Sequence, residues 1–166
     1  MAKIIQLNKI LLHNYLDQLI QIDEDNFGID AWFETQFSME KSQKFNLSFI
    51  VLEANQVIGY LIAYQTSQTQ VHISRLAIHT KFQNKKWGQS LIKAVFEKVQ
   101  NTYGVITVEH QISGMLNKFY QKKGFRTLFD EEIDDYLAQM RKTEKRYLYL
   151  GKQKSRVVKK IEFNKP

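Results

Sequence analysis

The sequence predicts an α+β fold in which helices pack against a mixed sheet. Runs rich in β-branched and aromatic residues alternate with amphipathic stretches, in the order β-α-α-β-β-β-α-β-α-β-α-β. The chain also has no internal repeat and no low-complexity linker, and its single proline is the last residue. Nothing in the sequence therefore divides the 166 residues into separate domains.

The first half is expected to hold a strand, two helices and three further strands. Residues 3–7 form an apolar strand, and Asn8 can cap a helix whose apolar side chains recur to Ile20. The charged stretch "DEDNFG" predicts a turn that ends this helix, and Asp30 opens a shorter second helix within 29–43. The three strands, the first two in a hairpin around "ANQ", are expected at 48–53, 57–66 and 69–79.

The second half is expected to alternate between helices and strands. A one-sided apolar pattern predicts a helix from Gly88 to about Tyr103, and Gly124, a natural left-handed C-cap, ends the next helix. Acids at the start and bases at the end of 130–145 favour a third helix, because they match the helix dipole. Strands are expected at 104–110, 125–129 and 146–151, and 157–163 is either one more strand or a fraying tail.

Composition excludes several classes of site and of protein. The chain has no cysteine, which rules out disulfides, thiolate metal sites and a cysteine nucleophile. No apolar run approaches the roughly 20 residues that span a membrane. The first residues, "MAKIIQLNKILLHNYLDQLIQ", lack the continuous apolar core and the cleavage site of a signal peptide. We therefore expect a cytoplasmic protein with no metal site.

The net charge of +7 is concentrated at the C-terminus. From Arg141 onward there are ten basic residues and two acidic ones, so the rest of the chain is close to neutral. Such a segment suits nucleic acid, a membrane surface or an acidic partner, but charge alone favours a solvated end. We expect no membrane partner, and nucleic acid is the weaker alternative because no recognised binding module accompanies the basic residues.

Residues 75–99, "RLAIHTKFQNKKWGQSLIKAVFEKV", combine three features in one order. An apolar strand ends, a basic loop with a glycine follows, and an amphipathic helix begins. A helix start exposes backbone N–H groups and the positive end of the helix dipole, which together favour an anion. The sequence therefore predicts an anion site at this loop.

The segment "RLAIHTKFQNKKWGQSLI" resembles the coenzyme-binding motif of the GNAT superfamily of N-acetyltransferases, and "SGMLNKFYQKKGF" resembles a later motif of that family. The resemblance implies one domain over 1–151 and a basic tail at 152–166. It implies a mostly antiparallel sheet whose two central strands splay apart, and acetyl-CoA as co-substrate, with its diphosphate as the anion. The positions it implies in coenzyme binding are Leu76, Ala77, Ile78, Gln83, Asn84, Lys85, Lys86, Trp87, Gly88, Gln89, Ser113 and Tyr120.

Two positions depart from the family pattern, which in the loop is roughly Arg/Gln-x-x-Gly-x-Gly/Ala. Lys86 stands at the first glycine position. A positive φ there would strain lysine by about 1 kcal/mol or more, whereas an ordinary φ would leave a cation near the phosphate. Ser113 stands where the later motif often has asparagine, and it can still donate a hydrogen bond. Gly88, where the backbone must approach closely, is retained.

The resemblance implies direct attack of an amine on the thioester in a ternary complex, with an acid for the leaving thiolate and a base for the amine proton. Tyr120 stands at the place of the family's tyrosine acid. The base is open among Glu109, His110 and His72. Glu109 is slightly favoured over His110, and the two point to opposite faces of one strand. The structural alternatives are a packed aromatic for Tyr120 and buried or surface polar residues for the others.

In this family the first two helices and their loop line the acceptor site. Here that region offers Asp23, Glu24, Phe27 and Trp32, and acids beside aromatics suit a cationic amine. A polyamine, an aminoglycoside-like amine, a protein lysine or a protein N-terminus would each fit. The structural alternative is a charged turn followed by a helix with a buried aromatic face.

The expected function is therefore an acyl-CoA-dependent N-acetyltransferase that acts on a primary amine. The alternative is a non-catalytic CoA-binding module that serves as a sensor or interaction partner. Whether the chain works as a homodimer stays open.

Overall fold

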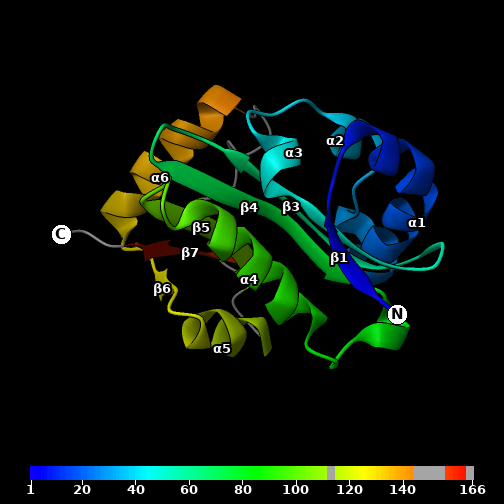
Figure 1. The fold of residues 1–166 in the computed structure, drawn as a ribbon. Helices are drawn as coiled ribbons and strands as arrows, with labels where there is room; N and C mark the ends of the chain where they lie inside the picture. Colours follow the sequence, from blue (N-terminus) through cyan, green and yellow to red (C-terminus); the bar gives the residue numbers. More distant parts are fainter. Residues whose placement is uncertain (112–114, 144–155, 164–166) are drawn as a thin grey trace. The chain divides into compact units, whose positions relative to one another are not determined.

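The computed structural model describes residues 1–111, 115–143 and 156–163. The chain forms two compact units, the first made of residues 1–64 and 74–99 and the second of 65–73 and the described residues from 100 onward. Strand β4 (Gln70–Ile78) runs through both units. The strand order is β1-β2-β3-β4 in the first unit and β4-β5-β7-β6 in the second (Figure 1). A mixed sheet with helices confirms the predicted α+β class.

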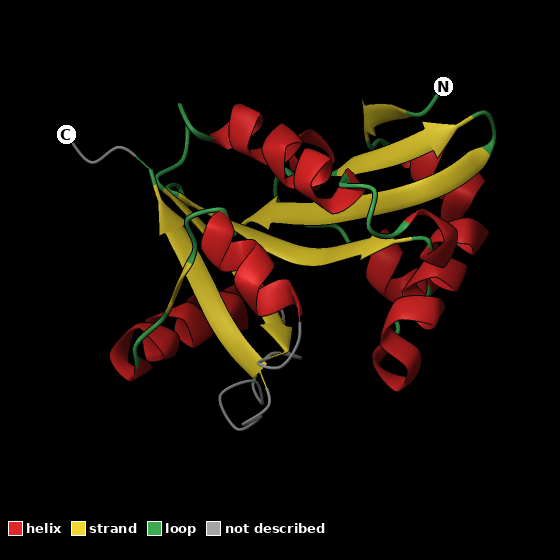
Figure 2. Cartoon of the chain, turned by 90° about the horizontal axis from the view of Figure 1, so that it is seen from below, coloured by secondary structure: helices red, strands yellow, loops and turns green. Residues whose placement is uncertain are grey.

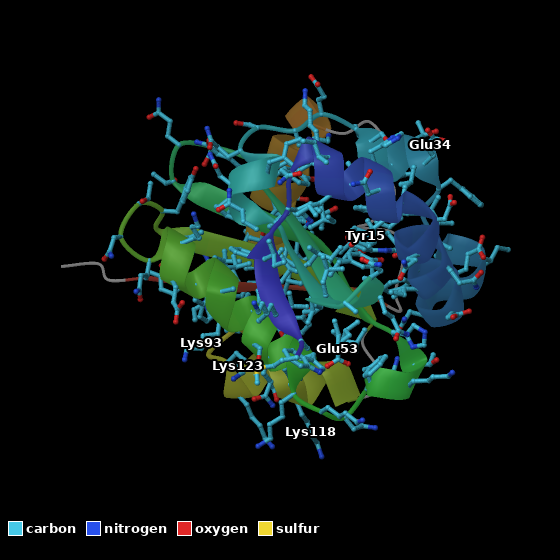
Figure 3. All side chains as sticks on the ribbon, turned by 45° about the vertical axis from the view of Figure 1, so that its right-hand side comes forward. Tyr15, Glu34, Glu53, Lys93, Lys118 and Lys123 are labelled. Atoms are coloured by element: carbon cyan, nitrogen blue, oxygen red, sulfur yellow. The ribbon has the colours of Figure 1, made fainter. Side chains whose placement is uncertain are left out.

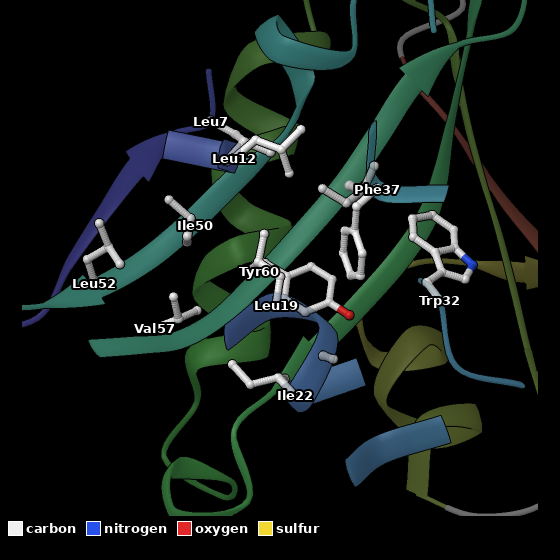
Figure 4. Packing of buried hydrophobic residues seen from close by; sticks show 12 residues of the cluster. Leu7, Leu12, Leu19, Ile22, Trp32, Phe37, Ile50, Leu52, Val57 and Tyr60 are labelled. Atoms are coloured by element: carbon white, nitrogen blue, oxygen red, sulfur yellow. The ribbon is translucent and has the colours of Figure 1, made fainter. Parts of the chain in front are cut away.

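The first unit contains three antiparallel strands, the end of β4 and most of the helices. Its strands are β1 (Lys3–Gln6), β2 (Phe49–Glu53) and β3 (Gln56–Gln65). Its helices are α1 (Lys9–Phe27), α2 (Glu34–Ser38), α3 (Lys44–Leu47) and α4 (Trp87–Val99), with 3₁₀ turns η1 (Gly28–Asp30) and η2 (Thr80–Phe82). Helices α1 and α4 lie on opposite faces of this part of the sheet (Figure 4). Because both faces are covered, eight consecutive residues of β3 are buried.

The core on the α1 side joins that helix to β2 and β3 (Figure 4). Leu19 and Ile22 of α1 pack in one cluster with Ile50, Val57 and Tyr60. Phe37 of α2 makes edge-on ring contacts with Trp32 and with Tyr60, each with ring centroids 5.4 Å apart. The helix α2 has only five residues, and these aromatic contacts hold it and the loop before it against the core.

In the second unit, strand β5 (Val105–Gln111) lies between β4 and β7 in the strand order. Figure 2 distinguishes the helices and strands of the chain by colour. The other elements of this unit are α5 (Met115–Lys122), β6 (Arg126–Thr127), α6 (Asp130–Thr143) and β7 (Arg156–Glu162). The first half of β4 runs parallel to β5, with Gln70 opposite Val105 and Ile73 opposite Val108. Strand β7 lies antiparallel to both β5 and β6.

The structure corrects two expectations for the first half of the chain. The stretch "DEDNFG" does not form a turn: α1 continues through it to Phe27, and Gly28, whose φ is +55°, is the C-cap. The single second helix expected within 29–43 is instead the 3₁₀ turn η1 followed by the five-residue α2. Both differences arise because Asp23 and Trp32 have tertiary partners, described below, that outweigh local composition.

At the C-terminus the structure decides between two alternatives. Arg156–Glu162 is the strand β7, not a fraying tail. The expected strand at 146–151 and the boundary between a domain at 1–151 and a tail at 152–166 lie outside the described residues.

Gly59 of β3 lies against the end of β4 so closely that a side chain does not fit. A Cβ at this position would lie 2.5 Å from Ile78 Cδ1 and 2.9 Å from the Ala77 carbonyl oxygen. We expect Gly59→Ala to lower the free energy of unfolding by about 1–3 kcal/mol, because the backbone oxygen cannot move aside cheaply. Urea denaturation measures this change. Gly104→Ala is the control, since its Cβ would meet only the Thr69 carbonyl oxygen at 3.8 Å, and an equal loss in both variants would contradict the explanation.

Candidate active site

The second half of β4 carries the three strand positions predicted to bind the coenzyme. The register that joins β4 to β5 ends at Ile73. Leu76, Ala77 and Ile78 follow that paired segment, in the part of β4 that belongs to the first unit. Ala77 is buried, whereas Leu76 and Ile78 are half-buried.

The predicted anion site corresponds to a loop of exposed residues and the start of α4. Gln83, Asn84, Lys85 and Lys86 are all exposed. The Lys86 carbonyl accepts a hydrogen bond from the Ser90 amide at 3.1 Å, so Lys86 occupies the N-cap position of α4. The amides of Trp87 and Gly88 therefore belong to the first helical turn, where backbone N–H groups have no intrahelical acceptor.

Gly88 leaves open space at this helix start. A Cβ built at this glycine meets no other heavy atom within 4 Å, in contrast to Gly59. Packing within the protein therefore does not require a glycine here. Backbone N–H groups, the helix dipole and two exposed lysines suit a diphosphate, so the residues present fit the nucleotide end of a coenzyme.

Lys86 adopts the strained one of the two conformations considered for it. Its φ is +67°, and Asn84, two residues earlier, has a φ of +62°. Asparagine tolerates this left-handed region, but for lysine it costs about 1 kcal/mol or more. The loop thus keeps the backbone shape that the glycine of the family pattern would give, and lysine adopts it at a cost.

We expect Lys86→Gly to raise the free energy of unfolding by up to about 1 kcal/mol, because glycine adopts a positive φ without strain. Lys85→Gly removes the same charge from a neighbouring position that lacks a positive φ. This control should lower the free energy of unfolding by about 0.5–1 kcal/mol. Chemical denaturation of both variants measures the two changes. A lower free energy of unfolding in both variants would mean that Lys86 is not strained.

Asp23 and Arg75 form a buried ion pair that gathers three of the four predicted acceptor residues. Arg75 donates from Nε to Asp23 Oδ1 at 2.8 Å and from a terminal nitrogen to Asp23 Oδ2 at 2.7 Å. The guanidinium lies 3.6 Å from the ring centroid of Phe27 and 5.1 Å from that of Trp32. Glu24, the fourth residue, is exposed on the next position of α1.

The same pair fixes the loop after α1. Asp23 accepts from the Trp32 amide at 2.5 Å and from the Tyr60 hydroxyl, while Arg75 donates to the Asp30 carbonyl at 2.7 Å. Burial, and then the Asp23 carboxylate, hold the pKa of Tyr60 well above its ordinary value, so this phenol stays a donor. Both carboxylate oxygens of Asp23 are engaged, and its side chain is fully buried.

The predicted catalytic residues lie in the second unit. Tyr120 of α5 is buried, and its ring packs edge-on against Phe119 and Phe125, with ring centroids 5.2 and 5.4 Å apart. Burial raises the pKa of the Tyr120 phenol well above its ordinary value. Glu109 is half-buried on β5. Ser113 lies outside the described residues.

His72 of β4 is a buried histidine with partners in the same unit. Its Nδ1 lies 3.0 Å from Thr107 Oγ1, and its ring centroid is 5.6 Å from that of Tyr136. The side chain is 1% exposed. These contacts match the buried polar alternative that the sequence left open for this residue.

Three residues of the first unit that bear on the site were not singled out from the sequence. Arg75 and Tyr60 contact Asp23, and these three residues together with Trp32 form what we call the Asp23 cluster. Asn26 of α1 contacts both β4 and the loop. An arginine inside an apolar strand, "ISRLAI", was a signal that a buried acid must be near, since buried charges are paired. Asn26 and Tyr60 carried no comparable signal.

Within the described ranges, no group of three or more His, Asp or Glu side chains could hold a metal ion. No helix in that part of the chain is long and apolar enough to span a membrane.

Solved acetyltransferases share this fold. The ribosomal-protein-S18-alanine N-acetyltransferase from Escherichia coli has 11% identity and a TM-score of 0.71, over 100% of this chain and 96% of that one. The PaiA N-acetyltransferase from Thermoplasma acidophilum, in complex with coenzyme A, has 14% identity and a TM-score of 0.67, over 98% and 99%. Naa50 from Arabidopsis thaliana, with the bisubstrate analogue CoA-Ac-MVNAL, has 12% identity and a TM-score of 0.68, over 98% and 99%.

Sequence comparison adds the family to the fold. A search of the curated proteins finds no match. A family model described as an acetyltransferase (GNAT) domain matches residues 19–143, which is well over half of the chain. The chain therefore belongs to the GNAT acetyltransferase family.

Proposed function

We propose that this protein transfers an acetyl group from acetyl-CoA to a primary amine by direct attack in a ternary complex. The observation that carries the proposal is the start of α4: exposed loop lysines, first-turn amides and an open Gly88 suit a diphosphate. Leu76–Ile78 of β4 would hold the amide-rich arm of the coenzyme through backbone groups. Membership of the GNAT family supports the same donor.

Tyr120 is proposed as the acid and Glu109 as the base. A phenol whose pKa is raised by burial keeps its proton through the neutral range, which suits a group that protonates a leaving thiolate. Glu109 is preferred because it is half-buried on β5, whereas His72 is buried and lies against Thr107. His72 remains the second candidate for the base.

The acceptor is proposed to be a cationic amine that meets the region after α1. Asp23 already neutralises Arg75, so its part in the proposal is to hold the Trp32 loop. Glu24, the residue after Asp23, is exposed, and its carboxylate supplies the attraction for an ammonium group. A protein N-terminus, a lysine or a small polyamine each presents this charge. We place the reaction in the cytoplasm.

Calorimetric titration with acetyl-CoA tests the donor, and release of free CoA over a panel of amines tests the transfer. Micromolar or tighter binding together with amine-dependent CoA release is the expected result. Binding without release from any amine would favour the alternative of a CoA-binding sensor module, which the departure from the family pattern at Lys86 keeps open. No binding would reject both functions.

Tyr120→Phe is expected to lower kcat by about 10²–10⁴-fold with little change in acetyl-CoA affinity, since only the transferable proton is lost. Steady-state kinetics and calorimetry on the same preparation measure the two quantities. Phe119→Leu is the control, because it alters the ring contact at 5.2 Å and leaves the hydroxyl in place. Unchanged turnover in Tyr120→Phe would reject the acid role.

A further inference from the structure

Asn26, in the last turn of α1, links the end of β4 to the first residue of the predicted coenzyme loop. Its side-chain amide nitrogen donates to the Ile22 carbonyl at 2.8 Å and to the Ile78 carbonyl at 3.0 Å. Gln83 Nε2 donates to Asn26 Oδ1 at 3.1 Å and to the same Ile78 carbonyl at 3.2 Å. Asn26 of α1 thus contacts the end of β4, 52 residues away in sequence, and the start of the loop, 57 residues away.

Contacts of the neighbouring residues hold the backbone around Asn26 in place. Three residues earlier on α1, Asp23 is locked to Arg75 of β4 by two hydrogen bonds. The next residue after β4, His79, donates its amide to the Ile58 carbonyl of β3 at 2.8 Å. Helix α1 and strand β4 are therefore already joined, and the Asn26 side chain extends that rigid pair to Gln83.

The chain leaves β4 at Ile78 and returns to the same point at Gln83. Between them, two hydrogen bonds to His79 close the turn η2. The Phe82 amide donates to the His79 carbonyl, and the Lys81 amide donates to His79 Nδ1. After Gln83 come the two left-handed residues and the start of α4. The position of Gln83 thus decides where the amides of the first turn of α4 lie relative to β4.

We propose that Asn26 is a positioning residue for the coenzyme loop, and that Gln83 acts through Asn26 and the Ile78 carbonyl instead of contacting the diphosphate. The inference rests on the proposed function, because it assumes that the loop binds acetyl-CoA. Backbone amides that bind an anion must be held within about half an ångström of the binding geometry. Here the exposed side chains of Asn26 and Gln83 support the loop because both donate to the Ile78 carbonyl.

Acetyl-CoA affinity is the first test. We expect Asn26→Ala to weaken binding about tenfold, Gln83→Ala to weaken it equally, and the double variant to be no weaker than either alone. Asn14→Ala is the matched control, since Asn14 is another exposed asparagine of α1 and should bind acetyl-CoA like the unmodified protein. Wild-type affinity in Asn26→Ala, or losses that multiply in the double variant, would overturn the proposal.

Amide hydrogen exchange without coenzyme separates this inference from the proposed function. In Asn26→Ala the backbone amides of residues 83–88 should exchange faster than in Asn14→Ala, while the denaturation midpoints of the two variants stay equal. This result supports the positioning role even if the wild-type protein fails to bind acetyl-CoA, an outcome that would reject the proposed function alone. Equal exchange rates in the two variants would reject the positioning role.

Discussion

Arg75→Met is expected to lower the free energy of unfolding by about 3–5 kcal/mol, because it leaves a buried carboxylate without its cation. The guanidinium neutralises a carboxylate that is 0% exposed and that also accepts from the Trp32 amide and the Tyr60 hydroxyl. Methionine fills a similar volume but leaves the Asp23 charge buried without a cation. Removing one partner of a buried pair costs far more than removing both.

Urea denaturation measures this loss of stability. Two further variants test whether it comes from leaving a buried charge without its partner. Arg126→Met breaks a pair with the same closest N–O distance, 2.7 Å, but its Arg126 side chain is 46% exposed, so about 0–1 kcal/mol is expected. The double variant Arg75→Met with Asp23→Leu removes both buried charges and should recover part of the stability. A loss below about 1 kcal/mol in Arg75→Met would contradict the assignment of a buried, fully desolvated pair.

The Asp23 cluster also shows why the expected turn after the first helix was wrong. Local composition treats "DEDNFG" as a solvated, helix-breaking run. In the structure, the first acid of that run is neutralised by an arginine 52 residues away, and the run completes α1. A partner so distant in sequence leaves no trace in periodicity, so sequence alone predicted an acceptor region around Asp23 but not the buried ion pair that Asp23 forms with Arg75.

Charge was equally ambiguous for β7. The sequence allowed either a strand or a fraying end for residues 157–163, because adjacent lysines are also compatible with solvent. In the structure Lys159 is buried and donates to Thr127 Oγ1 at 2.9 Å, while Lys160 pairs with Glu132 of α6 and with Glu162. The acids that make this strand possible lie partly on another element, which the charge count of the segment does not include.

The helix start at α4 was the part of the candidate site most accessible from sequence, because its signal is local. A strand, a basic loop and an amphipathic pattern follow one another within 25 residues, and the structure has β4, the loop and α4 in that order. What sequence did not supply was the support behind the loop. The resemblance named Gln83 as a coenzyme-binding position and gave no signal for Asn26, and only the structure shows that both side chains donate to the Ile78 carbonyl.

Gly88→Leu is expected to weaken acetyl-CoA binding by at least about a hundredfold while the protein remains folded. A side chain at this position meets no heavy atom of the protein within 4 Å, so it causes no clash in the free protein. Replacing glycine within a helix should even raise the free energy of unfolding, by about 0.5–1 kcal/mol. The side chain instead occupies the space that the first-turn amides of α4 offer to an anion.

Opposite changes in stability and in affinity make this variant decisive, because misfolding cannot produce both. Calorimetry with acetyl-CoA and urea denaturation are measured on the same sample. Lys93→Leu places the same side chain farther along α4, where the lysine is 78% exposed and points away from the helix (Figure 3). This control should retain the affinity of the unmodified protein. If Gly88→Leu retained it as well, the start of α4 would not be where the coenzyme diphosphate binds.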